Sequence, residues 1–418
     1  MTQPALNKLF VLVLVTLLSA CSALRDVKND LEVADALSNL TGRVSVTNDL
    51  DASSVRVLLL KKEGDFDLSL INQTSADQSG SYTIFAPPGE FFLVAYIDIN
   101  NDFVFQDETE KAGYLGQTLG PPKLIKVERQ SSHEIENIQI SGLLAHTGDY
   151  QVSNKLNHPK VRTGALVSLN DPMFSSENAF MGMMKPIEFV NTVGGGIFLF
   201  EPYDPDKIPV LMIHGIQGSV SNWERVISQM DTEKFQPFAV YYASGFRLDL
   251  ISDFILKGMT KLQEQYNFKQ FYVVSHSMGG LVARSFVKKY TGVEQDADIG
   301  LFATINSPMM GMDSANSGIR YSPIIVPSWR DVASGSAFIN GLMQWDLPQD
   351  IPYYLFFSYE SGDGDDGVVS LESQIPSKLQ QEATRVFGFN ASHAGVLSEA
   401  DFLEQFNQVL MKHSATGL

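Results

Sequence analysis

The sequence has a single cysteine and few basic residues, and both shortages exclude whole classes of protein. Its 418 residues include only Cys21, so the chain forms neither an intrachain disulfide nor a cysteine-rich zinc site. It carries 30 Lys and Arg residues against 48 Asp and Glu residues, which gives a formal net charge of -18. Nucleic acids and anionic lipid surfaces are bound through basic patches, so this acidic chain is expected to bind no nucleic acid.

Long apolar runs are also scarce, and the clearest one lies at the N-terminus. Lys8 precedes an apolar run of about ten residues, whereas a helix that spans a bilayer needs roughly 20. Residues 1–20 are therefore interpreted as a signal peptide, and no internal transmembrane helix is expected. With 44% hydrophobic and 19% charged residues, the rest is neither disordered, collagen-like nor a long coiled coil, and its length predicts two or three domains.

The sole cysteine directly follows this apolar run, in the sequence LSAC at 18–21. The pattern resembles the bacterial lipobox, in which the cysteine is lipidated and becomes the mature N-terminus. The resemblance implies a lipoprotein anchored in a membrane through Cys21. Ser22, in place of an aspartate, implies sorting to the outer membrane, facing the periplasm or the exterior. The alternative is an ordinary secretory signal in which the cysteine stands by chance.

Residues 41–145 are predicted to form an all-β domain after a tether or short helix at 21–40. Short segments rich in Val, Ile, Leu and aromatic residues alternate with turn signals, a pattern typical of a β-sandwich. The run SGSYTIFAPPGEFFLVAYIDINND at 79–102 resembles the prealbumin-like sandwich modules appended to many secreted proteins. Such a domain serves as a spacer, an interaction module or a carbohydrate binder, and the spacer is favoured.

An acidic loop within this domain offers oxygen ligands of the kind that calcium requires. Asp98, Asn100 and Asp102 occupy alternate positions. The EF-hand pattern is not met, because Phe103 stands where the turn glycine belongs and Thr109 where the bidentate glutamate belongs. The loop is therefore interpreted as a solvated acidic turn, with a calcium site as the alternative.

Residues 146–189 show weak periodicity and are predicted to be a connector, whereas strands and helices alternate from 190 to 415. The continuous apolar run at 208–213 is typical of a strand buried on both faces. Further strands are expected at 271–274, 299–305, 353–357 and 385–389. This alternation predicts an α/β domain with a mainly parallel sheet covered on both faces.

The strongest chemical signal is VSHSMGG at 274–280, where a predicted strand meets a predicted helix. Ser277 lies at the turn between the small residues Ser275 and Gly279, as the tight bend of a nucleophile elbow requires. The usual pattern is G-x-S-x-G, and Ser275 replaces its first glycine; serine is still small, so the elbow is expected to form. Ser277 is therefore the predicted nucleophile, and a helix-capping serine turn is the alternative.

A serine hydroxyl becomes a useful nucleophile only when a base takes its proton. Two histidines follow Ser277 in the chain, and the base of such an elbow comes last, after an acidic residue. His413 lies in the C-terminal tail. His393 lies between the last predicted strand and the last predicted helix, so His393 is the predicted base.

Four segments of the chain together resemble the α/β-hydrolase superfamily over about residues 190–415. They are PVLMIHGIQGSVSNW, FYVVSHSMGGLVARSFV, ATINSPMMG and DDGVVSLES. Within the superfamily they are most similar to lipases, esterases and enzymes like the GPI inositol-deacylases. Relatives often carry Thr-Pro-His where this chain has Ser-Pro-Met at 307–309, which leaves the subfamily open.

The resemblance also implies where the acidic residue and the oxyanion donors lie. Many hydrolases have an aspartate shortly before a Val-Val pair, so Asp366 fits best, with Asp365 and Asp363 as alternatives. The backbone amides of Met278 and Ile216 are expected to bind the oxyanion.

Two further histidines lie close to these segments in the sequence. His214 begins the His-Gly-x sequence, which resembles the oxyanion loop of bacterial lipases. Because His393 already fills the role of base, His214 and His276 are interpreted as structural.

The predicted hydrolase contains an apolar insertion at 311–350, which on this fold caps the active site. An apolar cap favours acyl chains, and a packed structural excursion is the alternative. The sequence has no phosphate loop, zinc pair or dinucleotide fingerprint, so no cofactor is expected. The residues together predict a membrane-anchored serine hydrolase, of lipase or esterase type, that cleaves hydrophobic esters. An acyltransferase or thioesterase with the same triad, or a non-catalytic scaffold lipoprotein, is the alternative.

Overall fold

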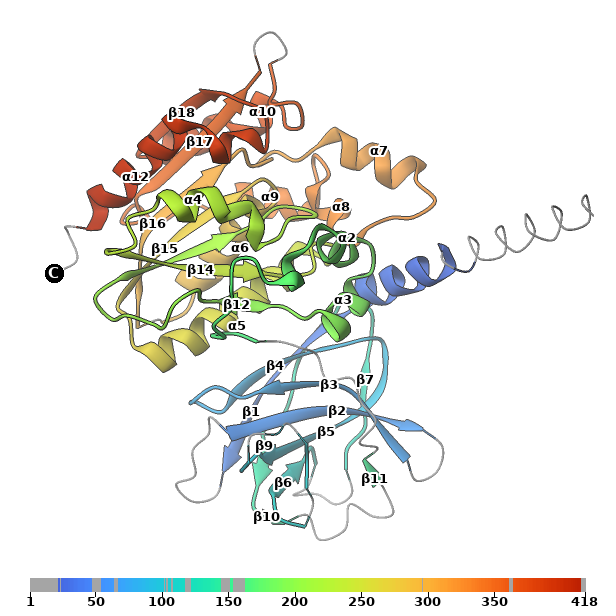
Figure 1. Ribbon diagram of the computed structural model, residues 1–418. Helices are drawn as coiled ribbons and strands as arrows, with labels where there is room; N and C mark the ends of the chain where they lie inside the picture. The colour runs from blue at the N-terminus through green and yellow to red at the C-terminus, as the bar shows by residue number, and fades with distance from the viewer. Residues whose placement is uncertain are drawn as a thin grey trace, which may run out of the picture.

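A computed structural model gives the fold of the chain, which consists of an all-β domain and a larger α/β domain (Figure 1). It describes residues 22, 24–46, 54–63, 67–100, 102, 104–106, 108–116, 122–143, 151–152, 162–294, 296–360 and 364–414. Within these residues, no helix combines the length and the apolar character that a membrane crossing needs. Cys21 and the predicted signal peptide lie outside the described residues.

The all-β domain is a sandwich of two sheets, as predicted. One sheet has the order β4-β1-β8 with β9 beside β1, and the other has the order β10-β6-β5-β2-β3-β11 with β7 beside β5. Their inward-facing residues, such as Leu40 and Ile84 from one sheet and Val57 and Leu93 from the other, share one apolar core. The strands are β1 (Ser38–Val46), β2 (Val55–Glu63), β3 (Asp67–Ser75), β4 (Ser81–Ala86), β5 (Gly89–Ile97), β6 (Lys111–Tyr114), β7 (Ile125–Val127), β8 (Ser132–Glu134), β9 (Ile138–Ile140), β10 (Gly142–Leu143) and β11 (Gln151–Val152).

The α/β domain is built on a seven-stranded sheet with the order β12-β14-β13-β15-β16-β17-β18. β12 is antiparallel to β14, and the other neighbouring strands are parallel. The strands are β12 (Gly196–Phe198), β13 (Ile208–Ile213), β14 (Phe235–Tyr241), β15 (Gln270–His276), β16 (Asp298–Ile305), β17 (Tyr353–Tyr359) and β18 (Arg385–Asn390). The mainly parallel sheet and the five strands predicted from apolar runs are thereby confirmed.

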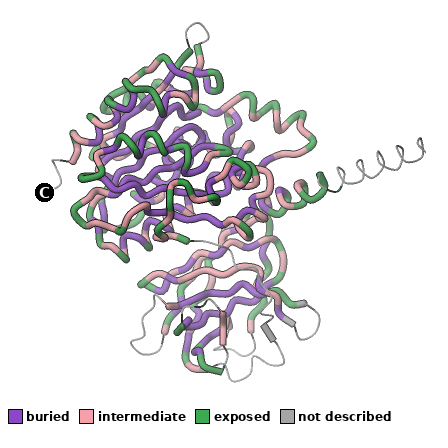
Figure 2. The backbone as a smooth tube through the Cα atoms, in the orientation of Figure 1, coloured by how far each residue is buried: buried purple, intermediate pink, exposed green. Residues whose placement is uncertain are grey.

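Helices cover both faces of this sheet, because its central strands are apolar on both sides. In β13, Leu211 and Ile213 pack toward one core and Val210 and Met212 toward the other, and Figure 2 shows the buried strands at the centre of the domain. The helices are η2 (Pro172–Phe174), α2 (Ser176–Met184), α3 (Pro186–Thr192), η3 (Val220–Trp223), α4 (Glu224–Gln229), α5 (Leu248–Tyr266), α6 (Gly279–Thr291), α7 (Asp313–Tyr321), α8 (Pro327–Val332), α9 (Ala337–Met343), α10 (Leu371–Gln374), α11 (Ser377–Glu382), η4 (Gly395–Ser398) and α12 (Ala400–Ser414). Residues of α5 and α6 pack on one face, and residues of α4 and α12 pack on the other.

Two predicted boundaries differ from the structure. The segment interpreted as a tether or short helix contains a helix at residues 24–36, and β1 begins at Ser38, before the predicted start of the sandwich at 41. The predicted connector contains α2 and α3, and Phe189 of α3 is fully buried against the α/β domain. Both segments are ordered by contacts with distant parts of the chain, such as the Asp30 carboxylate that accepts hydrogen bonds from the first amides of α3. Local periodicity cannot report such contacts.

Candidate active site

Ser277 lies in the turn between β15 and α6, as the elbow pattern predicts. Its φ of +56° is left-handed, a conformation that is strained for a residue other than glycine. The Ser277 N–H donates to the carbonyl of Ile305 at 2.9 Å, which fixes the turn against β16. Gly279 is required here, because a Cβ on it would lie 2.4 Å from the carbonyl oxygens of Ile213 and His214. The Ser275 hydroxyl, in the place of the usual glycine, donates to the Ala303 carbonyl at 3.1 Å.

The structure brings Ser277, His393 and Asp366 into one hydrogen-bonded row, although they are far apart in the sequence. The Oγ of Ser277 lies 2.8 Å from Nε2 of His393, and Nδ1 of His393 lies 2.7 Å from Oδ2 of Asp366. Ser277 is 8% exposed and Asp366 is 1% exposed. A base within hydrogen-bond reach of a hydroxyl, itself oriented by a carboxylate, is the geometry of nucleophilic serine catalysis.

Asp366 is held in place by its own backbone surroundings. Its Oδ1 accepts hydrogen bonds from the amides of Val368 and Val369, at 3.0 and 2.7 Å. Its backbone carbonyl accepts from the His393 N–H at 2.8 Å, so the acid loop and the base loop are tied together. The carboxylate of Asp365 instead accepts from the Gly367 N–H at 2.9 Å. Asp363 lies outside the described residues.

The two predicted oxyanion donors lie on either side of Ser277. Ile216 and Met278 both line the cavity above the serine, and neither backbone N–H has an acceptor among the described residues. Met278 immediately precedes α6, where the helix dipole favours negative charge. Gly215 lets the oxyanion loop approach, because a Cβ at this position would lie 2.7 Å from the Cβ of Ser277.

His214 packs against the residues that hold the predicted oxyanion loop, and it is not hydrogen-bonded to Ser277, His393 or Asp366. Its ring stacks on Tyr242 with centroids 4.1 Å apart, and the Tyr242 hydroxyl donates to the His214 carbonyl. Complete burial lowers the pKa of His214 to about 4, so its ring is neutral at pH 7. The hydroxyl of Ser244 accepts from the Gln217 N–H at 2.9 Å and fixes the other end of the loop.

His276 and Asn306 hold the backbone of the base loop. Nε2 of His276 lies 2.9 Å from the His393 carbonyl, and the Asn306 amide donates to the same oxygen at 3.0 Å. Burial lowers the pKa of His276 to about 4, with repulsion from His393 acting in the same direction. Asn306 and Tyr242 were not singled out from the sequence. Asn306 has a φ of +47°, a left-handed conformation that asparagine tolerates better than most residues, but this preference did not reveal its role.

The serine opens into a cavity of about 420 Å³ whose outer wall comes from the predicted cap. The cap segment contains α7, α8 and α9, and its residues Met312, Ala315, Trp329 and Val332 line the cavity. Gly318 also lines it, where a Cβ would come within 3.1 Å of the Trp329 ring. The residues that the cap contributes to this cavity are therefore mostly apolar, which suits a hydrocarbon group.

The acidic loop of the sandwich satisfies its carboxylates internally. Asp98 is buried and pairs with Arg56 at 3.0 Å, and Asp102 accepts from the Val104 N–H and the Gln106 amide at 2.8 Å each. Within the described parts of the chain, no three His, Cys, Asp or Glu side chains converge as metal ligands.

Comparisons with known proteins concern the α/β domain. A family model described as an alpha/beta hydrolase of unknown function matches residues 247–388, a segment that contains Ser277 and Asp366. A gene product of Listeria innocua is 19% identical, with 50% of this chain and 95% of that chain covered and a TM-score of 0.40. A mature lipase of Bacillus licheniformis is 15% identical, with 50% and 94% covered and a TM-score of 0.40. Lipase B of Aspergillus fumigatus is 16% identical, with 50% and 53% covered and a TM-score of 0.39. A search of curated proteins finds no match.

The α/β domain is an α/β-hydrolase domain. The strand order, the elbow between β15 and α6 and the matching family model agree on this assignment. The fold class expected from the sequence is thereby confirmed.

Proposed function

We propose that the protein is a serine hydrolase that cleaves carboxylic esters with a hydrophobic acyl group. The observation that carries the proposal is the hydrogen-bonded row of Ser277, His393 and Asp366 beneath an apolar cavity. A hydroxyl within 2.8 Å of a histidine ring needs no cofactor to become a nucleophile toward a carbonyl carbon.

The reaction runs in two halves through an acyl-enzyme. His393 Nε2 takes the proton of Ser277 as Oγ attacks the ester carbonyl, and Asp366 stabilises the imidazolium that forms. The amides of Ile216 and Met278 bind the oxyanion, and His393 then gives its proton to the leaving alcohol. Water, activated by the same histidine, attacks the acyl-enzyme and releases the carboxylic acid.

The experiment that tests this proposal is hydrolysis of p-nitrophenyl esters of short, medium and long acyl chains. The wild-type protein is expected to hydrolyse these esters, and its rate is expected to be highest for an acyl length that fills the cavity. Ser277→Ala is expected to lose activity to the background, while its melting temperature stays close to wild type. Equal rates in both proteins, or no turnover of any ester by the wild type, would contradict the proposal.

We further propose that lipidation of Cys21 holds the enzyme at the outer membrane. Its support is the LSAC sequence and the short distance along the chain from Cys21 to the N-terminal helix. Asp35 of that helix forms ion pairs of 3.5 Å with Arg247 and with Arg330. An anchor at Cys21 would therefore keep the α/β domain close to the bilayer. Mass spectrometry of the N-terminus should find a diacylglyceryl cysteine, and its absence would contradict the anchor.

A further inference from the structure

A second cavity lies where the sandwich meets the α/β domain, away from the candidate active site. It has a volume of about 360 Å³, within the range of small-molecule sites, which starts at roughly 300 Å³. Its walls come from β3 and β4 of the sandwich and from the N-terminal helix, α3 and α5. No residue that lines it also lines the cavity above Ser277. The reaction described above makes no use of it.

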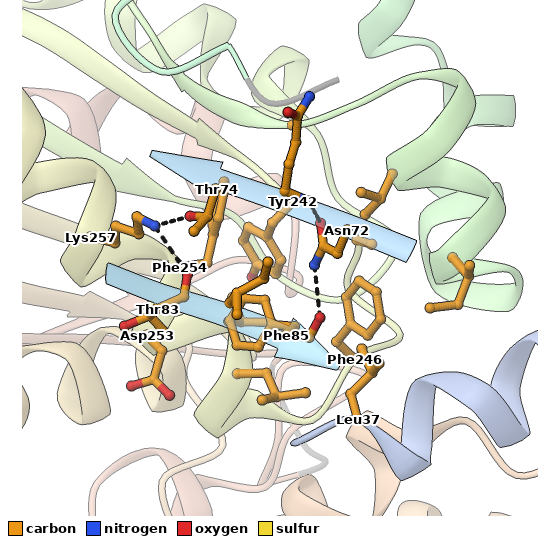
Figure 3. Close-up of a pocket in the computed structure, with 18 of the residues that line it drawn as sticks. Leu37, Asn72, Thr74, Thr83, Phe85, Tyr242, Phe246, Asp253, Phe254 and Lys257 are labelled. Carbon is orange, nitrogen blue, oxygen red and sulfur yellow. Dashed lines mark hydrogen bonds between the residues drawn. The ribbon is translucent and has the colours of Figure 1, made fainter. Parts of the chain in front are cut away.

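One end of this cavity is apolar. Leu37, Phe85 and Phe246 line it, and Figure 3 places them on the side away from Lys257. α5 contributes a second apolar face here: Leu250 and Phe254 line the cavity, while other residues of the same helix pack on the sheet. Water in such a space contacts mostly hydrocarbon, so a ligand with an acyl chain would gain free energy by displacing it.

The other end carries Lys257 of α5, which lies between the two domains. Figure 3 shows the Lys257 ammonium directed at strands β3 and β4, where it donates to the Thr74 hydroxyl and, at 3.1 Å, to the Thr83 carbonyl. Within the described part of the chain, no carboxylate lies within 4.0 Å of this ammonium. Asp253 also lines the cavity, but its two oxygens are taken by Lys289 and Asn39.

This arrangement leaves the half-buried Lys257 ammonium without an ion pair among the described residues, and the charge of Asp77 offsets the effect of burial only in part. Burial lowers the pKa of Lys257 to about 7, because the charged form loses its hydration there. Lys261, one helical turn further along α5, also lines the cavity and adds positive charge at the same end. A buried charge is stabilised by an opposite charge that hydrogen-bonds to it, so an anionic group is the chemical complement of this end.

We propose that the interdomain cavity binds a single-chain anionic amphiphile, with its head group at Lys257 and its acyl chain along Phe254, Phe246 and Leu37. The head group is a carboxylate, as in a long-chain fatty acid, or a phosphate monoester, since both accept hydrogen bonds from an ammonium. The proposal does not depend on ester hydrolysis, because the site shares no residue with the candidate active site.

The test measures ligand binding by the full chain carrying Ser277→Ala, so that turnover plays no part. Isothermal titration with dodecanoate is expected to show saturable binding, weakened about tenfold or more by the additional change Lys257→Met. Lys269→Met is the matched control, because Lys269 is an exposed lysine outside the cavity, and it is expected to leave the affinity unchanged. A parallel titration with dodecyl phosphate distinguishes the two head groups: tighter binding than dodecanoate indicates a phosphate monoester, and weaker binding indicates a carboxylate. Dodecanol, which is neutral, should bind about tenfold or more weakly than the better anion.

A photoreactive dodecanoate with a terminal diazirine locates the ligand. Cross-links are expected on the N-terminal helix, Phe85 or Phe246, and Leu250→Trp is expected to abolish them by filling the cavity. This second variant keeps the test decisive if Lys257→Met fails to fold. Cross-links confined to residues 312–332, or equal binding of dodecanol and dodecanoate, would overturn the proposal. The same holds if Lys257→Met folds and binds as tightly as its control.

Discussion

Replacing Asp366 by asparagine tests the role of the carboxylate without changing its shape. In the structure, Oδ1 accepts from the amides of Val368 and Val369, and Oδ2 accepts from Nδ1 of His393. An asparagine keeps the two backbone hydrogen bonds only if its oxygen takes the position of Oδ1. Its NH2 group then faces His393, which must accept at Nδ1 and carry its proton on Nε2. That tautomer cannot take the proton of Ser277.

The alternative orientation of the asparagine is unfavourable. It would turn the NH2 group toward two backbone donors and leave both without an acceptor, at a cost of about 1–3 kcal/mol each. We therefore expect the wrong tautomer to dominate and kcat to fall about 10⁴-fold, the loss that this change causes in serine proteases. A 10⁴-fold loss corresponds to about 5.4 kcal/mol in the activation free energy.

The assay is p-nitrophenyl ester hydrolysis, with kcat and KM measured beside the melting temperature. Asp365→Asn is the matched control, since Asp365 bonds to the Gly367 N–H, and we expect it to change kcat by less than about threefold. A folded Asp366→Asn protein that keeps a tenth or more of wild-type kcat would refute the reasoning. So would an equally large loss in Asp365→Asn.

Three further predictions follow from the surroundings of the site. Gly215→Ala should lower kcat about 100-fold or more, because the new Cβ would lie 2.7 Å from the Cβ of the nucleophile; Gly341→Ala, whose Cβ meets no described atom within 4 Å, should leave kcat unchanged. Trp329→Ala should shift the preferred ester toward longer acyl chains, whereas Trp345→Ala, outside the cavity, should not; identical profiles would contradict a substrate-contacting cap. His214 has a folded pKa of about 4 against an ordinary 6.5, so the unfolded chain binds its proton first as pH falls. Denaturant titrations should therefore show an unfolding free energy that decreases from pH 6.5 to 4, by up to about 3 kcal/mol from this residue, and a flatter decrease in His214→Asn.

The strands of the sheet and the nucleophile Ser277 could be predicted because each has a local signature in the sequence. A strand buried on both faces is a continuous apolar run, as at 208–213, and the elbow is a short pattern at a strand end. His393 then followed from chain order and from its place after the last predicted strand, whereas Asp366 was chosen through the resemblance to hydrolases that carry an aspartate shortly before a Val-Val pair. The order of the seven strands has no such signature and came only from the structure.

Other features depend on contacts between distant segments and leave no local pattern. The N-terminal helix is fixed by Asp30 at α3 and by Asp35 at two arginines, so its sequence alone could not decide between a tether and a short helix. Lys257 reads as an ordinary charged residue of an amphipathic helix until the sandwich covers that face of α5. Asn306 and Tyr242 act through backbone carbonyls, which no sequence motif reports.

The most direct test of the central claim is covalent labelling with an alkyl fluorophosphonate, which reacts with an activated serine. Peptide mass spectrometry of the wild-type chain should find one adduct, on Ser277. Ser277→Ala and His393→Ala should remain unlabelled although folded, because one lacks the nucleophile and the other its base. An adduct on another residue, no adduct at all, or labelling of Ser277 at the same rate in His393→Ala would contradict the proposed catalytic machinery.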